Sequence, residues 1–190
     1  MRDFNYTIIR DNKWDSELLG LIAAIYKEAG KQEMYLKQRP EELDKLVRQL
    51  RENDDEDLAK DFMAHFYRSF AISNFSVSQY AKFLHYVMKT EDPVLWHCSM
   101  GKDRCGIATL MILELLNVDR ESIKEDYLYT NEVYGIYDTD TESGFDIADE
   151  SYIEAFYDEV EKVYGDMSSF FEEMNIDDKE IYEFRQRVLI

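Results

Sequence analysis

The chain has 190 residues, 45% of them hydrophobic and 14% aromatic, and carries a formal net charge of −19. This composition argues against intrinsic disorder and predicts a single globular domain over residues 1–190. The acidic balance disfavours binding to nucleic acid or to anionic lipid surfaces. No apolar stretch is long enough to span a bilayer, and the first residues do not resemble a signal peptide. With only two cysteines, the chain is expected to be cytoplasmic, with secretion by a route without a signal peptide as the alternative.

The negative charge is concentrated in the C-terminal part of the sequence. Residues 1–70 carry 12 basic and 15 acidic side chains (net −3), and residues 71–117 carry 4 of each (net 0). Residues 118–190 carry 6 basic and 22 acidic side chains (net −16). A site for an anion must therefore be built locally, and the neutral segment 71–117 is the place for it.

The first half of the chain is predicted to be mainly helical. A β-branched and aromatic run predicts a strand at residues 4–9, and helical periodicity follows at residues 16–29. Apolar residues spaced by three and four predict a helical pair in residues 40–70, which is either ordinary core packing or a lid over an active site. Ser76 is expected to cap the next helix, which leads into a turn at residues 90–93.

A short apolar run at residues 94–96 (Val-Leu-Trp) predicts a buried strand. A loop follows, and a nearly all-round apolar helix starts near Arg104. The sequence therefore predicts a strand–loop–helix unit. With one or two strands in all, the predicted fold class is α/β, rich in helices, with a small parallel sheet.

The C-terminal third is predicted to be helical, with one exposed polar loop at residues 135–148. Asp119 and Asp149 are expected to cap two helices, and Gly165 is expected to end the second. Two shorter helices are predicted at residues 167–174 and 177–188.

The loop after the predicted strand holds Cys98 and Arg104, with Gly101 between them. A strand–loop–helix turn directs several backbone N–H groups and the positive end of a helix toward one point, which suits an anion such as phosphate. These surroundings lower the pKa of Cys98 below the free value of about 8.5 and make it a nucleophile. Arg104 offers a planar pair of donors to phosphoryl oxygens. The pattern predicts phosphoryl transfer to Cys98 followed by hydrolysis, with no metal or other cofactor required.

The leaving group of such a reaction needs a proton, and Asp103 is the acid nearest to the loop. Its alternative role is that of a structural partner for Arg104 or Lys102. Lys102 is expected at the rim, where it either recognises further phosphates or offsets the acidic body. His97 is expected to orient the loop through hydrogen bonds. The residues expected to bind the substrate are Ser99, Met100, Gly101, Lys102 and Arg104.

The pair His97-Cys98, followed by five residues and Arg104, resembles the phosphate-binding loop of cysteine-dependent protein tyrosine phosphatases. The longer sequence HCSMGKDRCG at residues 97–106 resembles one branch, the bacterial tyrosine and phosphoinositide phosphatases with a Gly-Lys-Asp-Arg loop. The similarity runs from about residue 76 to the end of the chain.

This resemblance implies a cysteine-phosphatase-like fold with Cys98 as nucleophile and Arg104 as phosphate binder. It also implies Asp103 as a general acid within the loop and Lys102 as a residue that favours phosphoinositides or broadens specificity. Because family members can cover the site with a helical lid, it favours the lid interpretation of residues 40–70.

The sequence departs from the family pattern in two places. The longer, strand-rich N-terminal half that is usual in the family is not matched in this sequence, so the sheet is expected to be small. The expected explanations are a shortened form of the family fold, substitution by residues 1–35, or a contribution from a second subunit. Cys105 stands where the family has Ser or Thr. A thiol is a weaker donor than a hydroxyl, so slower breakdown of the phosphoenzyme is expected. Cys105 could also form a protective disulfide with Cys98 on mild oxidation, or simply be a small buried side chain.

The predicted function is that of a metal-independent phosphatase for phosphomonoesters. Phosphotyrosine is the first expected substrate, with phosphoinositide or phosphoserine and phosphothreonine as alternatives, so the expected partner is a phosphorylated protein or a phosphoinositide. Two other functions are considered: a non-catalytic phosphate-binding module and a thiol redox protein that uses Cys98 and Cys105.

Overall fold

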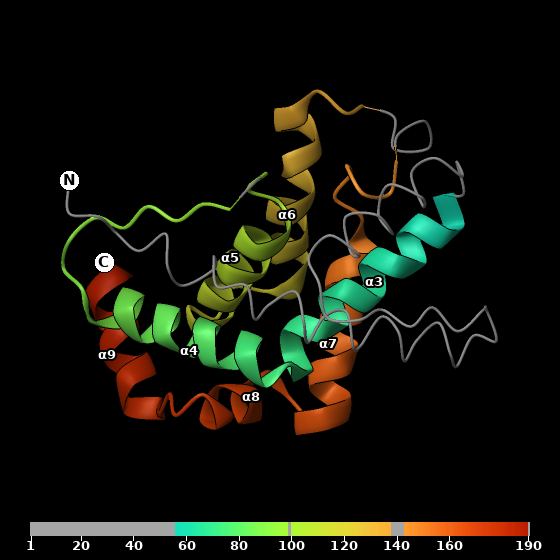
Figure 1. Cartoon of the computed structure of the whole chain (residues 1–190). Helices are drawn as coiled ribbons and strands as arrows, with labels where there is room; N and C mark the ends of the chain where they lie inside the picture. The colour runs from blue at the N-terminus through green and yellow to red at the C-terminus, as the bar shows by residue number, and fades with distance from the viewer. Residues whose placement is uncertain (1–55, 99, 138–142, 190) are drawn as a thin grey trace.

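The computed structural model describes residues 56–98, 100–137 and 143–189. The strand predicted at residues 4–9, the helix predicted at 16–29 and the first part of the pair predicted at 40–70 lie outside these residues. So does Ser99. The part of the chain that is described is a group of helices (Figure 1). In chain order they are α3 (Glu56–Ile72), α4 (Asn74–Lys89), α5 (Asp103–Leu115), α6 (Arg120–Tyr134), α7 (Glu150–Tyr164), α8 (Met167–Glu173) and α9 (Asp178–Val188).

The predicted richness in helices is confirmed, whereas the predicted sheet is not found within the described residues. Residues 94–96 have no regular secondary structure, and Leu95 is 85% exposed. Trp96 instead packs its ring against Phe83, with ring centroids 5.8 Å apart, and donates from Nε1 to Thr109 Oγ1 at 3.3 Å. Because a strand is stable only with a hydrogen-bonding neighbour, the apolar composition of this segment does not by itself produce one.

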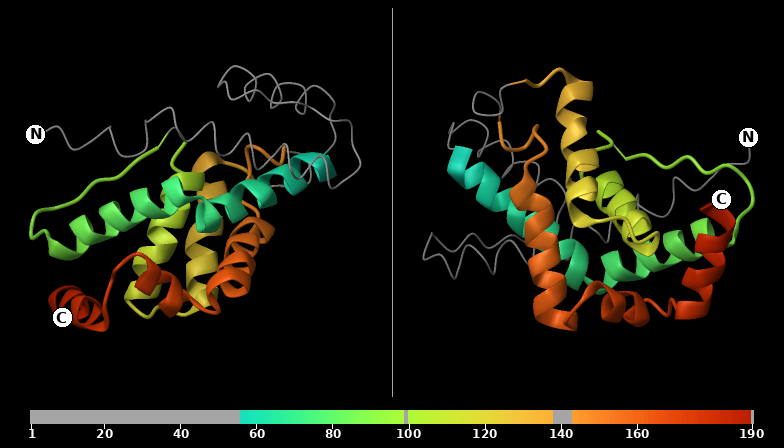
Figure 2. Two further views of the ribbon diagram at one scale, coloured as in Figure 1. Left: turned by 60° about the horizontal axis from the view of Figure 1, so that its bottom comes forward. Right: turned by 180° about the vertical axis from the view of Figure 1, so that it is seen from behind.

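The core is formed mainly where α3 packs along α7 (Figures 1 and 2). Large aromatic side chains that are fully buried fill this contact and its continuation into α8; they are Tyr67, Phe70, Tyr152, Phe156 and Phe170. Burying each such ring stabilises the fold by about 2–3 kcal/mol. Residues 56–70 of the predicted pair thus belong to a helix that packs into the core, and the lid interpretation of residues 40–70 stays a prediction.

The helix ends follow local capping chemistry. The side chains of Asp119 and Asp149 accept hydrogen bonds from backbone N–H groups at the starts of α6 and α7, and Gly165 ends α7, as predicted. The cap of α4 is Ser73, not Ser76, because Ser73 is the residue with extended backbone and its side chain accepts from the N–H of Ser76.

The buried α5 runs through the core next to α6, as its all-round apolar pattern predicts. The segment of residues 143–148, by contrast, was predicted to be exposed but carries buried Phe145, Ile147 and Ala148. Asn131 of α6 holds it, since its Nδ2 donates to the Ala148 carbonyl at 2.8 Å and its Oδ1 accepts from the Ala148 N–H at 2.7 Å. No helix within the described ranges is long and apolar enough to cross a membrane.

Candidate active site

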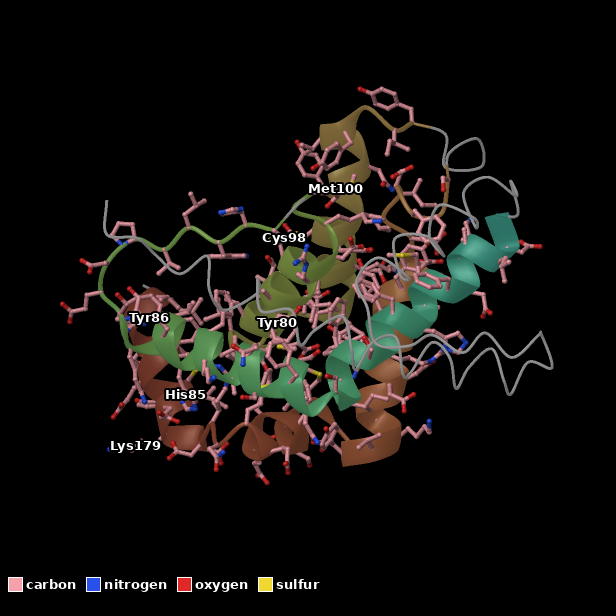
Figure 3. All side chains as sticks on the ribbon, viewed as in Figure 1. Tyr80, His85, Tyr86, Cys98, Met100 and Lys179 are labelled. Atoms are coloured by element: carbon pink, nitrogen blue, oxygen red, sulfur yellow. The ribbon has the colours of Figure 1, made fainter. Side chains whose placement is uncertain are left out.

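The predicted phosphate-binding segment, residues 97–104, is called the Cys98 loop here. It leads directly into α5, so the loop lies at the N-terminal end of a buried helix. Gly101 has a φ of +75°, a backbone conformation that glycine adopts without strain. This turn aims the Gly101 N–H at Cys98 Sγ, 3.1 Å away. Cys98 and Met100 lie beside the first turn of α5 and the nearby end of α6 (Figure 3).

The sulfur of Cys98 is surrounded by groups that favour the thiolate. Its pKa falls to about 5, mainly because the thiol of Cys105 hydrogen-bonds to it. The backbone N–H groups of Cys105 and Gly101 and the charge of Arg104 act in the same direction, while partial burial opposes them. The pKa of Cys105 is raised, mainly by the same hydrogen bond to Cys98. At neutral pH the loop therefore holds an anionic, nucleophilic sulfur on Cys98 and a thiol on Cys105.

Arg104 lies in the first turn of α5, as predicted, and its positive charge acts on both Cys98 and Tyr80. The Tyr80 hydroxyl of α4 donates to the Arg104 carbonyl at 3.2 Å and ties this turn to the neighbouring helix. The ring of His97 is exposed, with its Nδ1 3.2 Å from the Cys98 carbonyl oxygen. The structure thus brings Cys98 and Arg104 together and places His97 in contact with the loop backbone.

Two buried side chains contact the carboxyl group of Asp103. Its Oδ1 accepts a hydrogen bond from the Tyr67 hydroxyl at 2.8 Å and lies 3.3 Å from Lys102 Nζ. About a fifth of the side chain (22%) is exposed, so Asp103 is not fully enclosed by the protein. Both contacts come from buried side chains, because Tyr67 and Lys102 are at most 1% exposed.

Lys102 does not lie at the rim, where the sequence placed it. Its Nζ donates to the carbonyl oxygens of Phe145 and Ile147, both at 2.8 Å, in addition to its contact with Asp103. An ammonium group has three protons, and these carbonyl and carboxylate oxygens are acceptors that the protein itself supplies. The burial of Lys102 is possible because the 143–148 segment, more than forty residues later in the chain, folds over it.

Several site residues were missed by the sequence analysis, and they are tyrosines. Tyr67 and Tyr80 look like ordinary members of the apolar faces of their helices, and only their hydroxyl groups reach the loop. On α6, the Tyr134 hydroxyl donates to the Met100 carbonyl. Also on α6, the Tyr127 ring lies against Gly106, where a Cβ would come within 3.1 Å of it. The available signal was the presence of tyrosine, rather than phenylalanine, on faces that are otherwise apolar.

The groups around Cys98 are of a kind that binds anions. In the part of the chain that the structure describes, no three His, Cys, Asp or Glu side chains are grouped so that they could hold a metal ion. The positive groups near Cys98 are instead Arg104, the backbone N–H groups and the start of α5. Such a set can bind a phosphoryl group and stabilise charge on its oxygens.

Comparison with known proteins shows similarity to phosphatases. A profile of the tyrosine phosphatase family matches residues 33–190, which include the Cys98 loop and every described helix. Over 79 residues the chain is 37% identical to the triple specificity protein phosphatase PtpB of Mycobacterium tuberculosis. The matched part covers 40% of this chain and 27% of PtpB, so the chain spans only about a quarter of that relative.

Proposed function

The chain belongs to the tyrosine phosphatase family, and on this premise we propose that it hydrolyses phosphomonoesters through a phosphocysteine on Cys98. The observation that carries this proposal is the position of Cys98 Sγ, which accepts a hydrogen bond from the Gly101 N–H at 3.1 Å in a loop that leads into the start of α5. These surroundings, with Cys105 and Arg104, lower the pKa of Cys98 to about 5. A thiolate at this position is a nucleophile at neutral pH, and the same surroundings that stabilise it would bind a phosphate.

The reaction has two steps. In the first, Cys98 Sγ attacks phosphorus, the bond from phosphorus to the ester oxygen breaks, and the leaving oxygen takes a proton from Asp103. In the second, water attacks the phosphocysteine, Asp103 takes a proton from that water, and Cys98 leaves as a thiolate. The Arg104 guanidinium and the loop N–H groups stabilise the phosphoryl oxygens in both steps.

Phosphotyrosine is the substrate that we favour. A phosphoinositide-specific site needs a cation for its additional phosphates, and Lys102 was the candidate. The Lys102 ammonium group is instead directed to Asp103 and to the carbonyl oxygens of Phe145 and Ile147. This arrangement supports a substrate with a single phosphate, and phosphoserine, phosphothreonine and phosphoinositide form the comparison arms of a substrate panel. A cytoplasmic location stays a prediction.

The proposal is tested with p-nitrophenyl phosphate in the presence of EDTA. The wild-type protein should turn over, and Cys98→Ser should lower kcat by about 10³-fold or more, because the hydroxyl of serine is a far weaker nucleophile here. Mass spectrometry of acid-quenched wild-type enzyme should show one phosphoryl group on the peptide that contains Cys98.

Three results would contradict this mechanism: turnover that survives Cys98→Ser, turnover that EDTA abolishes, or a phosphoryl group on another residue. A folded wild-type protein that binds phosphotyrosyl peptide without hydrolysing it would instead identify a phosphate-binding module.

A further inference from the structure

Two consecutive hydrogen bonds join the buried hydroxyl groups of Tyr127 and Tyr67 to the carboxyl group of Asp103. The Tyr67 hydroxyl donates to Asp103 Oδ1 at 2.8 Å and lies 2.7 Å from the Tyr127 hydroxyl. A hydroxyl group has one proton. Since that of Tyr67 is directed at Asp103, Tyr127 is the donor to Tyr67. This series of hydrogen bonds therefore runs from α6 through α3 to the first turn of α5.

The ring of Tyr67 is fixed by its neighbours. The side chain is fully buried, and its centroid lies 5.4 Å from that of Tyr152, 5.5 Å from that of Phe70 and 6.1 Å from that of Tyr127. Burial also raises the pKa of Tyr67 and of Tyr127 well above the ordinary value, so both remain neutral donors. The position of the Tyr67 hydroxyl is thus set by packing on three sides.

The two donors on Asp103 meet the same oxygen. Tyr67 and Lys102 both contact Oδ1. A proton that Asp103 carries for catalysis then resides on Oδ2, and the orientation of Oδ2 follows from how Oδ1 is held.

We infer that Tyr67 is a positioning residue for the proposed reaction, acting through Asp103 by fixing Oδ1 so that Oδ2 faces the leaving oxygen. The inference rests on the proposed function and adds to it a residue 36 positions before Asp103 in the sequence. It predicts that loss of the Tyr67 hydroxyl lowers kcat/KM most for substrates whose leaving group most needs a proton.

The test compares kcat/KM for two substrates, phenyl phosphate and p-nitrophenyl phosphate. Phenolate is the more basic leaving group and needs the acid more. Tyr67→Phe should lower kcat/KM about tenfold for phenyl phosphate and less than about threefold for p-nitrophenyl phosphate, because one hydrogen bond to the acid is lost while the ring is kept. Asp103→Asn should show a larger change of the same kind. Adding Tyr67→Phe to Asp103→Asn should change the ratio no further.

The matched control is Tyr157→Phe. Tyr157 is also buried, and its hydroxyl donates to Glu114 Oε1 at 2.7 Å, at the other end of α5. The eleven positions from Asp103 to Glu114 correspond to about 16 Å along the helix. This variant loses a comparable hydrogen bond and should leave the ratio between the two substrates unchanged.

If Tyr67→Phe does not fold, Tyr127→Phe tests the same series of hydrogen bonds, one bond further from Asp103. It should change the ratio of kcat/KM between the two substrates in the same direction by about threefold. An unchanged ratio in the folded variant, or a ratio that changes equally in Tyr157→Phe, would overturn the inference. Failure of the proposed function is separate, because it would appear as wild-type turnover that survives Cys98→Ser.

Discussion

Cys105, in the first turn of α5, determines which of the two cysteine sulfur atoms carries the negative charge. Its thiol hydrogen-bonds to Cys98, and this contact is the main reason that the pKa of Cys98 falls to about 5 while its own pKa rises. The negative charge therefore sits on Cys98, which is half-buried and can reach a substrate, and the proton stays on the buried Cys105. That a disulfide joins the two under mild oxidation stays a prediction.

Replacing Cys105 should change the titration of the nucleophile. Cys105→Ala removes the donor and should raise the pKa of Cys98 by about one to two units, because a hydrogen bond to a charged group contributes about 1.5–3 kcal/mol. The rate of inactivation by iodoacetamide, followed between pH 4 and pH 9, reports this pKa. The variant should react more slowly than wild type near pH 5 and equally fast above pH 8.

Cys105→Thr is the companion variant, since it restores a hydroxyl donor. It should keep the pKa of Cys98 low and raise kcat, as expected if the thiol slows breakdown of the phosphoenzyme. A pKa that stays near 5 in Cys105→Ala would contradict the role given to the thiol, and an unchanged kcat in Cys105→Thr would contradict the slow second step.

At the scale of elements, the sequence predicts what depends on neighbours in the chain. The cap residues Asp119 and Asp149 are correctly predicted because a side chain and the N–H groups it accepts from are two or three positions apart. The burial of Lys102 is not predicted, because its carbonyl partners lie 43 and 45 positions away. The predicted exposure of the 143–148 segment is wrong for the same reason.

The 143–148 segment contacts both the Cys98 loop and α6. Lys102 holds it from one side, and Asn131 holds it from the other by pairing with both backbone polar groups of Ala148. Asn131 is 9% exposed, so water cannot readily replace a lost partner. The pairing of Asn131 with Ala148 therefore stabilises the segment to which Lys102 donates and, through Lys102, the position of Asp103.

Asn131→Asp should destabilise the fold by about 2 kcal/mol, because it keeps the acceptor for the Ala148 N–H but turns a carboxylate oxygen toward the Ala148 carbonyl. Thermal unfolding should show a fall in Tm of about 4–8 °C. Asn74→Asp, at an exposed position at the start of α4, is the control and should not lower the free energy of unfolding by more than about 0.5 kcal/mol, because a negative charge is favourable at a helix N-terminus. Equal stability of the two variants would contradict the role of Asn131.

At the scale of the whole molecule, the chemistry is more predictable than the scaffold. Cys98 and Arg104 lie within one short motif, and the structure brings them together. The helices around them contribute Tyr67, Tyr80 and Tyr134 from three different elements. Those contacts depend on how α3, α4 and α6 pack against the loop and α5, which periodicity along one helix does not specify.

The net charge of −19 acts on every substrate that approaches this site. Most of it belongs to residues 118–190. Within this acidic part, the C-terminal end of α6 lies close to the loop, because Tyr134 donates to the Met100 carbonyl. Unscreened charge of one sign repels like-charged ligands and attracts opposite ones over distances of about a Debye length, about 10 Å at 0.1 M salt. The negative charge should therefore attract cationic peptides and repel anionic ones before they reach Cys98.

A phosphotyrosyl peptide with flanking lysines should have a kcat/KM about fivefold higher at low salt than a peptide of equal length with flanking glutamates. The difference should fall below about twofold near 1 M salt, where the Debye length is about 3 Å. Initial rates at several sodium chloride concentrations measure this, with p-nitrophenyl phosphate as the reference for salt effects on catalysis itself. A preference that persists unchanged in high salt would assign the discrimination to side chains in direct contact with the peptide, because only long-range attraction is removed by screening.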